Sequence, residues 1–200
     1  DKSTSSQNSS SDAPSLVQDE KIIKISRDEA LEESQRVLFE NDKIKGSISL
    51  LGSSIDDLTF KNYTNTLNGD DNVVLLNPKQ SENGYYVETG WATTNKNIDL
   101  PNSKSEWNIE GNNKLTPNSP VKLRWTNNQN ITFVKEISID KQYLFNIKQT
   151  IINSSDKTYN FYPYGQIIRN VAPDITNFYI LHEGLIGVFD DQLVEEDYDD

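Results

Sequence analysis

The sequence contains no cysteine and no methionine, and His182 is the one histidine among its 200 residues. Without cysteine, the chain forms no disulfide, no thiolate metal site and no cysteine nucleophile. A histidine-based metal site would need carboxylates for every ligand besides His182. Long apolar runs are missing too: none reaches the ~18 residues that a membrane-spanning helix needs. We therefore expect neither a metal nor a membrane span within the sequence as printed.

Positive charge is also scarce, with 19 Lys and Arg against 31 Asp and Glu and a formal net charge of −12. Nucleic-acid binding requires a basic surface, so this balance argues against it. The same charge disfavours contact with anionic lipid surfaces. The hydrophobic fraction is 34% and the mean hydropathy is −0.70, which indicates one core with generous polar loops. A chain of this length fits one domain that buries roughly 70% of its unfolded surface.

The N-terminal region has the composition of a linker. Residues 1–20 are rich in Ser, Gln and Asp, and such a segment buries too little apolar surface to order itself. Ser26 and Glu29 have the spacing of a capping box, which predicts a short helix from about residue 27 to 35. We expect residues 1–35 to be a Ser-rich linker that is disordered or partly helical.

Strands dominate the folded domain, which we expect over residues 36–200. Val121, Leu123 and Trp125 alternate with polar residues, which places the apolar side chains on one face of a strand. The same period of two predicts further strands at residues 37–39, 44–50, 73–76, 85–91, 131–139, 143–151 and 158–169. This alternation favours antiparallel sheets with one buried face.

Some segments carry more detailed predictions. On the strand after Trp125, the residues Ile131, Phe133, Ile137 and Ile139 share the buried face. Residues 73–76 are interpreted as a short buried strand, and residues 93–119 as a loop with one or two short strands. Residues 177–189 are interpreted as two short strands or a strand and a turn. The acidic residues 190–200 are expected to fray into solvent.

No catalytic constellation is visible in the sequence. A lone histidine in an apolar run, such as His182, is more often structural than catalytic, and no Gly-x-Ser-x-Gly pattern supports a serine hydrolase. The carboxylate pairs Asp56-Asp57 and Asp70-Asp71 lack calcium-loop spacing, so we interpret them as solvated surface. Remote carboxylates for glycoside hydrolysis stay open as a weak alternative. We predict no catalytic, cofactor-binding or metal-binding residues.

Aromatic residues near one sheet edge are the remaining candidates for binding. In Tyr162-Pro163-Tyr164-Gly165 the proline and glycine are expected to break the strand ladder and open the edge of the sheet. Tyr162 and Tyr164, together with His182, are therefore candidate groove or partner contacts. Trp125 and Phe161 are predicted to be core residues instead, as aromatic residues in strands usually are.

Three groups of segments, in order along the chain, resemble a known family. They are Gly46–Gly52 with Ile55–Leu58 and Lys61–Tyr63; Val73–Pro78 with Tyr85–Tyr86 and Gly90–Trp91; and Tyr162–Ile167 with Asn177–Gly184. In this order and spacing they resemble the large periplasmic domain of the bacterial membrane protein insertase YidC. The resemblance covers roughly residues 37–198.

The resemblance implies an all-β fold: a β-supersandwich of two large antiparallel sheets, with at most short helices. It implies a place at the periplasmic face of the bacterial inner membrane, with membrane anchors only in segments absent from the printed sequence. It also implies a non-catalytic part of an insertase and chaperone that inserts and helps fold membrane proteins, alone or with the Sec translocon. The expected partners are Sec accessory subunits and nascent membrane proteins.

Departures from the family and alternative functions limit this interpretation. The family's insertion machinery lies in a membrane bundle that the printed sequence does not contain, so this segment is not credited with insertase activity by itself. A carbohydrate- or peptide-binding module with a tyrosine-lined groove is one alternative. A mutarotase-like enzyme is another, although that chemistry uses histidines beside a glutamate and His182 stands alone.

Overall fold

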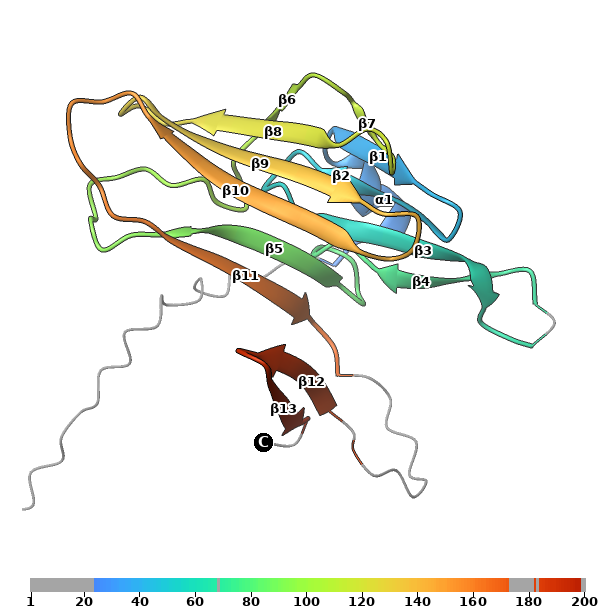
Figure 1. Ribbon diagram of the computed structural model, residues 1–200. Helices are drawn as coiled ribbons and strands as arrows, with labels where there is room; N and C mark the ends of the chain where they lie inside the picture. The colour runs from blue at the N-terminus through green and yellow to red at the C-terminus, as the bar shows by residue number, and fades with distance from the viewer. Residues whose placement is uncertain (1–23, 68, 173–181, 183, 199–200) are drawn as a thin grey trace, which may run out of the picture.

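The computed structural model describes residues 24–67, 69–172, 182 and 184–198, and the fold in this part of the chain is almost entirely β (Figure 1). One short helix, α1 (Arg27–Glu32), precedes the strands. The strands are β1 (Arg36–Glu40), β2 (Ile44–Ser49), β3 (Ile55–Thr64), β4 (Asn72–Leu76), β5 (Tyr85–Ala92), β6 (Asn108–Glu110), β7 (Lys114–Leu115), β8 (Val121–Thr126), β9 (Ile131–Ile139), β10 (Phe145–Asn153), β11 (Tyr162–Arg169), β12 (Gly184–Phe189) and β13 (Gln192–Asp197). The predicted linker at residues 1–20 and the segment 177–181 lie outside the described residues.

Two sheets form a β-sandwich. The larger sheet has the order β11-β5-β3-β2-β1-β7, with β4 paired to β3 beside this path. The smaller sheet, β10-β9-β8-β6, lies across its face (Figure 1). The predicted antiparallel sandwich is confirmed, with the exception that β1 and β7 pair in parallel. β12 and β13 form a separate two-stranded sheet.

The core lies between the two sheets and follows the predicted alternation. Val121 and Leu123 of β8 and Phe133 of β9 are buried, and they share one cluster with residues of the larger sheet. Trp125 and Phe161 are partly buried and pack against this cluster, so their predicted core role is confirmed only in part. The segment between β5 and β8, which contains the short strands β6 and β7, contributes more to the core than its polar composition suggests, because Trp107 and Leu115 are both buried.

Two local predictions are corrected by the structure. Residues 73–76 form a strand within β4, as predicted, and Leu76 is buried, but Val74 and Leu75 are 38% and 37% exposed because β4 pairs irregularly with β3 at the margin of the sheet. The acidic end does not fray within the described residues, since β13 pairs with β12 through Asp197. Asp190 and Asp191 turn the hairpin with positive φ angles of 49° and 63°. Aspartate tolerates this backbone region and is favoured in such two-residue turns.

The predicted helix is present but short. The Ser26 side chain accepts a hydrogen bond from the Glu29 backbone, and the Glu29 side chain accepts one from the Ser26 backbone, so the capping box is confirmed. The helix ends at Glu32, earlier than the predicted end near residue 35. Among the described residues, no helix is long and apolar enough to cross a membrane.

A β-bulge in β3 brings two carboxylates to the outer face of the larger sheet. Ile48 pairs with Ile55 while Ser47 pairs with Asp57, so Asp56 is an extra residue on β3. Strand side chains alternate between faces, and one extra residue lets two neighbours share a face. Asp56 and Asp57 therefore both lie on the face opposite the core residue Ile55.

These carboxylates are not solvated surface, contrary to the sequence-based prediction. Arg36 forms an ion pair with Asp56, and Arg27 at the start of α1 forms one with Asp57. Ser47 joins the two pairs, because its hydroxyl accepts from Arg36 Nε at 2.7 Å and donates to Asp57 at 2.6 Å. Burial raises the pKa of Asp56, while the Arg36 guanidinium acts in the opposite direction. The network fastens α1 to the outer face of the sheet.

Candidate functional site: an apolar groove between the sheets

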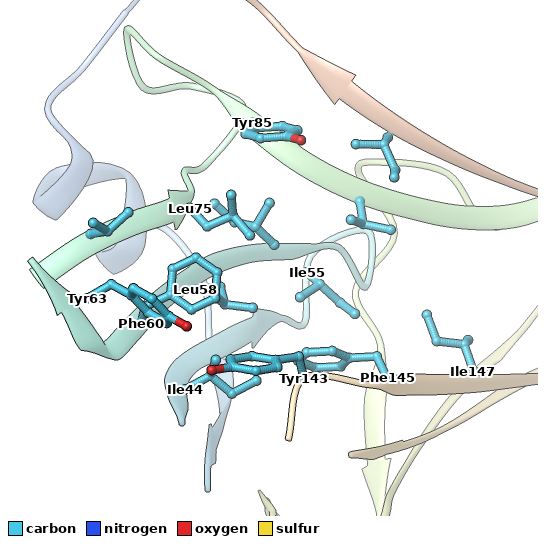
Figure 2. A pocket seen from close by; sticks show the side chains of 14 residues that line it. Ile44, Ile55, Leu58, Phe60, Tyr63, Leu75, Tyr85, Tyr143, Phe145 and Ile147 are labelled. Atoms are coloured by element: carbon cyan, nitrogen blue, oxygen red, sulfur yellow. The ribbon is translucent and has the colours of Figure 1, made fainter. Parts of the chain in front are cut away.

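An open groove of about 810 Å³ lies between β10 on one side and β3, β4 and β5 on the other. Figure 2 shows the side chains from these strands converging on a common space. Every lining residue is aliphatic or aromatic. They are Ile44, Ile55, Leu58, Phe60, Tyr63, Val73, Leu75, Leu76, Tyr85, Val87, Tyr143, Phe145, Ile147 and Ile167.

The groove has a buried floor and an exposed rim. Ile44, Ile55 and Leu58 are buried at its base, where they belong to the main core. Tyr63 and Tyr143 are about half exposed at its edge. The period-two pattern of β10 explains the other wall, because Phe145 and Ile147 point inward and Asn146 between them points to solvent.

An aromatic cluster forms the mouth of the groove. The Phe60 ring lies 5.5 Å from the Tyr63 ring and 5.9 Å from the Tyr143 ring, and both contacts are edge-to-face. Interaction with the Tyr63 hydroxyl raises the pKa of Tyr143. This cluster connects β3 to the segment that leads into β10, so it links the two sheets at one end.

Polar side chains link the sheets beyond the other end of the groove. Gln149, the next inward-facing residue after Ile147 on β10, donates from Nε2 to the Gly90 carbonyl at 2.8 Å. Lys135 of β9 donates from Nζ to the Thr89 carbonyl at 2.5 Å. Both acceptors belong to β5, where they follow the groove residue Val87 after Glu88.

Lys135 is the functional candidate that the sequence-based interpretation missed. It is 1% exposed, and burial lowers the pKa of its amine to about 7. Its Nζ also donates to the Ser53 hydroxyl at 2.5 Å and lies 5.0 Å from the Trp107 ring. A signal exists in the sequence, because Lys135 stands in phase with Phe133 and Ile137 on the buried face of β9.

The groove is suited to an extended apolar segment. Within the described part of the chain, β10 pairs only with β9, which leaves its other edge free for backbone hydrogen bonds. A peptide strand that adds to such an edge places alternate side chains in a neighbouring pocket. Sugars need several convergent polar groups, whereas the lining residues offer only tyrosine hydroxyls.

Tyr162 and Tyr164 lie on the opposite face of the larger sheet. In the β11–β5 register Tyr162 pairs with Ala92 and Tyr164 with Gly90, out of phase with the core residue Trp91. They are 55% and 40% exposed. The Tyr164 ring covers Gly90, where an added Cβ would lie 2.6 Å from the ring. The proline does not break the ladder as predicted, because β11 is an edge strand that pairs with β5 along its whole length.

His182 lies at the separate hairpin. Its Nδ1 is 3.0 Å from an Asp197 carboxylate oxygen, and its buried Nε2 has no hydrogen-bond partner among the described residues. Neither His182 nor the two tyrosines line the groove. His182 contacts Asp197 of β13, whereas Tyr164 packs over Gly90 of β5. Contact of these residues with a partner stays a prediction.

The described residues contain no cluster of three or more His, Asp or Glu side chains able to hold a metal ion. With its two packed sheets and open apolar groove, the structure defines a class of protein: an all-β sandwich domain with a groove between its sheets. The family follows from comparison with known proteins. The model of the YidC periplasmic domain matches residues 36–200, and the chain belongs to this family. The predicted family and periplasmic location are thereby confirmed.

Individual relatives agree with this assignment. The chain is 58% identical over 189 residues to the membrane protein insertase YidC of Pelagibacter ubique (strain HTCC1062), covering 94% of this chain and 34% of that protein. It is 38% identical over 172 residues to the insertase YidC of Dinoroseobacter shibae, covering 84% of this chain and 28% of that protein. The chain thus spans about a third of the length of such relatives. The insertase family is not an enzyme family in the usual sense.

Proposed function

We propose that the chain is the non-catalytic periplasmic part of a membrane protein insertase that helps insert and fold inner-membrane proteins, alone or with the Sec translocon. Within that role, the groove holds an extended apolar segment of a nascent membrane protein while the segment is exposed to the periplasm. Sec accessory subunits are the second class of partner, and the exposed Tyr162 and Tyr164 on the opposite face are their candidate contacts.

The observation that carries this proposal is the uniformly apolar lining beside a free strand edge. An apolar surface open to water is stable only if the rest of the fold supports it, and here Ile44, Ile55 and Leu58 anchor it in the core. A client segment that emerges in extended form satisfies both features at once: its backbone pairs with β10, and its alternate side chains enter the groove.

The test is peptide binding to the purified chain. A short fluorescein-labelled peptide in which valine alternates with serine and lysine serves as probe, and fluorescence anisotropy gives its Kd. Leu75→Glu places a charge at the groove rim, and we expect it to weaken binding about tenfold or more. The matched control is Leu38→Glu, because Leu38 is an exposed apolar residue on β1 that does not line the groove.

Equal affinity for wild-type chain and Leu75→Glu would show that the groove is not the binding site. Equal affinity for the alternating peptide and for a peptide of the same composition with its valines grouped together would contradict strand addition to β10. For the Sec contact, Tyr162→Ala with Tyr164→Ala in the complete insertase should reduce co-purification of accessory subunits, and unchanged co-purification would remove these residues from the interface.

A further inference from the structure

A buried lysine beyond one end of the groove connects the two sheets through several hydrogen bonds. Lys135 on β9 reaches the turn between β2 and β3 through Ser53 and reaches β5 through Thr89. Gln149, its cross-strand neighbour on β10, reaches the next β5 carbonyl at Gly90. Two segments of the larger sheet, the β2–β3 turn and β5, are therefore held by two side chains of the smaller sheet.

The backbone at Ser53 is strained in a way that matches this contact. Ser53 has a φ of 57°, a left-handed conformation that costs a non-glycine residue free energy. Its side chain is buried and donates to the Gly52 carbonyl at 2.6 Å while accepting from Lys135. Such strain persists where the surroundings hold the residue in place, and here the contact from Lys135 does so.

The surroundings of the amine contain little compensating charge. Trp91 and Trp107 face the Nζ with ring centroids 5.9 Å and 5.0 Å away. The turn between β2 and β3 contributes the uncharged Ser53, and β10 contributes the uncharged Gln149. Glu88 of β5 is the charged group that acts on the amine. The two indole faces and Glu88 favour the ammonium, but burial outweighs them and shifts the amine toward its neutral form.

We propose that the hydrogen bonds of Lys135 to Ser53 and Thr89 form a proton-controlled link between the two sheets. This link, called the clamp below, sets how far the groove can open. Protonation favours an arrangement in which the charged group is hydrated, and hydration requires β9 and β10 to move away from β5. Phe145 and Ile147 of β10 and Tyr85 and Val87 of β5 line the groove, so this movement widens it. The inference rests on the proposed function of the groove as a binding site.

Linkage gives the proposal a quantitative form. If the open groove binds an apolar segment better, and if Lys135 holds its proton better when the groove is open, then acid and ligand favour the same state. Because coupling between two ligands is reciprocal, the bound peptide must raise the pKa of Lys135. Each unit of that rise corresponds to a tenfold difference in peptide affinity between the acidic and basic limits.

The experiment follows the lysine and the peptide separately. Nitrogen NMR of the Lys135 amine and tryptophan fluorescence report its titration between about pH 5.5 and 8.5, on both sides of its pKa of about 7. The alternating peptide reports groove affinity over the same range. For the wild-type chain we expect affinity to rise about tenfold as pH falls, and saturating peptide to raise the titration midpoint by about one unit.

Lys135→Met should make the affinity independent of pH, whereas Lys148→Met, at an exposed position on β10, should leave the pH dependence intact. If Lys135→Met does not fold, the midpoint shift in the wild-type chain still decides the question.

A titrating Lys135 with pH-independent peptide affinity would overturn the clamp and leave the groove function standing. If no peptide binds at any pH, the groove function fails. The clamp is then judged by hydrogen exchange of β10: the protection factors of its amides, which correct for the intrinsic pH dependence of exchange, must fall below pH 7 in the wild-type chain and not in Lys135→Met.

Discussion

At the scale of single residues, the alternation rule was reliable for apolar side chains and failed for the polar one among them. It placed Phe133 and Ile137 in the core, where they are, but it did not include Lys135, which lies between them in the same phase. A lysine is almost never fully buried without partners, and its partners here come from distant parts of the chain. Ser53 and Thr89 cannot be assigned to Lys135 from the sequence, because no local pattern encodes a contact between sheets.

Burial of Lys135 predicts a stability that depends on pH. Between its folded pKa of about 7 and its ordinary value of 10.5, the unfolded chain holds a proton that the folded chain has released. The free energy of unfolding therefore rises with pH in this window, by about 1.4 kcal/mol per unit at most, and levels off below pH 7. Lys135→Met should remove this slope. Urea titrations at several pH values measure it, and a slope identical in both proteins would show that Lys135 does not carry it.

Two aromatic residues of the same cluster should differ in their contribution to stability. Phe133 is fully buried and contacts Trp91 and Trp125, so Phe133→Ala should destabilise by about 3–5 kcal/mol. Trp125 is only partly buried, and Trp125→Ala should cost less, about 2 kcal/mol. Chemical denaturation of both variants checks the order. A larger loss for Trp125→Ala would mean that its packing is more important than its burial indicates.

At the scale of elements, the strands and the helix cap could be predicted locally, whereas the bulge could not. The spacing of Ser26 and Glu29 is enough to indicate the cap of α1. The extra residue Asp56 is visible only when β2 and β3 are paired, because a bulge is a property of two strands. This is why the carboxylate pair was interpreted as surface. The groove is also a property of pairing and packing, since its walls come from strands that are far apart in the sequence.

The ion pairs under α1 predict how the chain responds to N-terminal truncation. Removing residues 1–20 should leave Tm unchanged within error, because the ion pairs under α1 involve Arg27 and Arg36, which this truncation keeps. Removing residues 1–35 deletes the whole of α1, and Asp57 loses its ion-pair partner Arg27. We therefore expect the free energy of unfolding to fall by about 2 kcal/mol, which lowers Tm by about 4–8 °C. Calorimetry of the two truncated chains decides this, and a drop already present without residues 1–20 would show that the Ser-rich segment packs on the domain.

At the scale of the whole molecule, the family membership predicts that this domain and the rest of the insertase have different roles. Insertion itself is expected to depend on parts of the insertase outside this domain, so His182→Ala in the complete protein should leave insertion nearly unchanged. Deleting most of residues 37–180 should impair partner contacts more than the insertion of simple clients. An in vivo insertion assay measures both. Loss of insertion in His182→Ala, with the Tm of the purified domain unchanged, would require a chemical or recognition role for His182.

The attachment of α1 also has a mechanical consequence. At residues 24–27 the chain is held by the backbone bridge between Ile25 and Ser81, by a hydrogen bond from Lys24 to the Ser81 carbonyl, and by the contacts of Arg27 with Asn77 and Asp57. A pulling force applied to the chain N-terminal of residue 24 breaks these contacts one after another. It does not load a full ladder of strand hydrogen bonds at the same time. The segment of residues 24–35 should therefore yield at low force and lengthen the tether while the sandwich behind it stays folded.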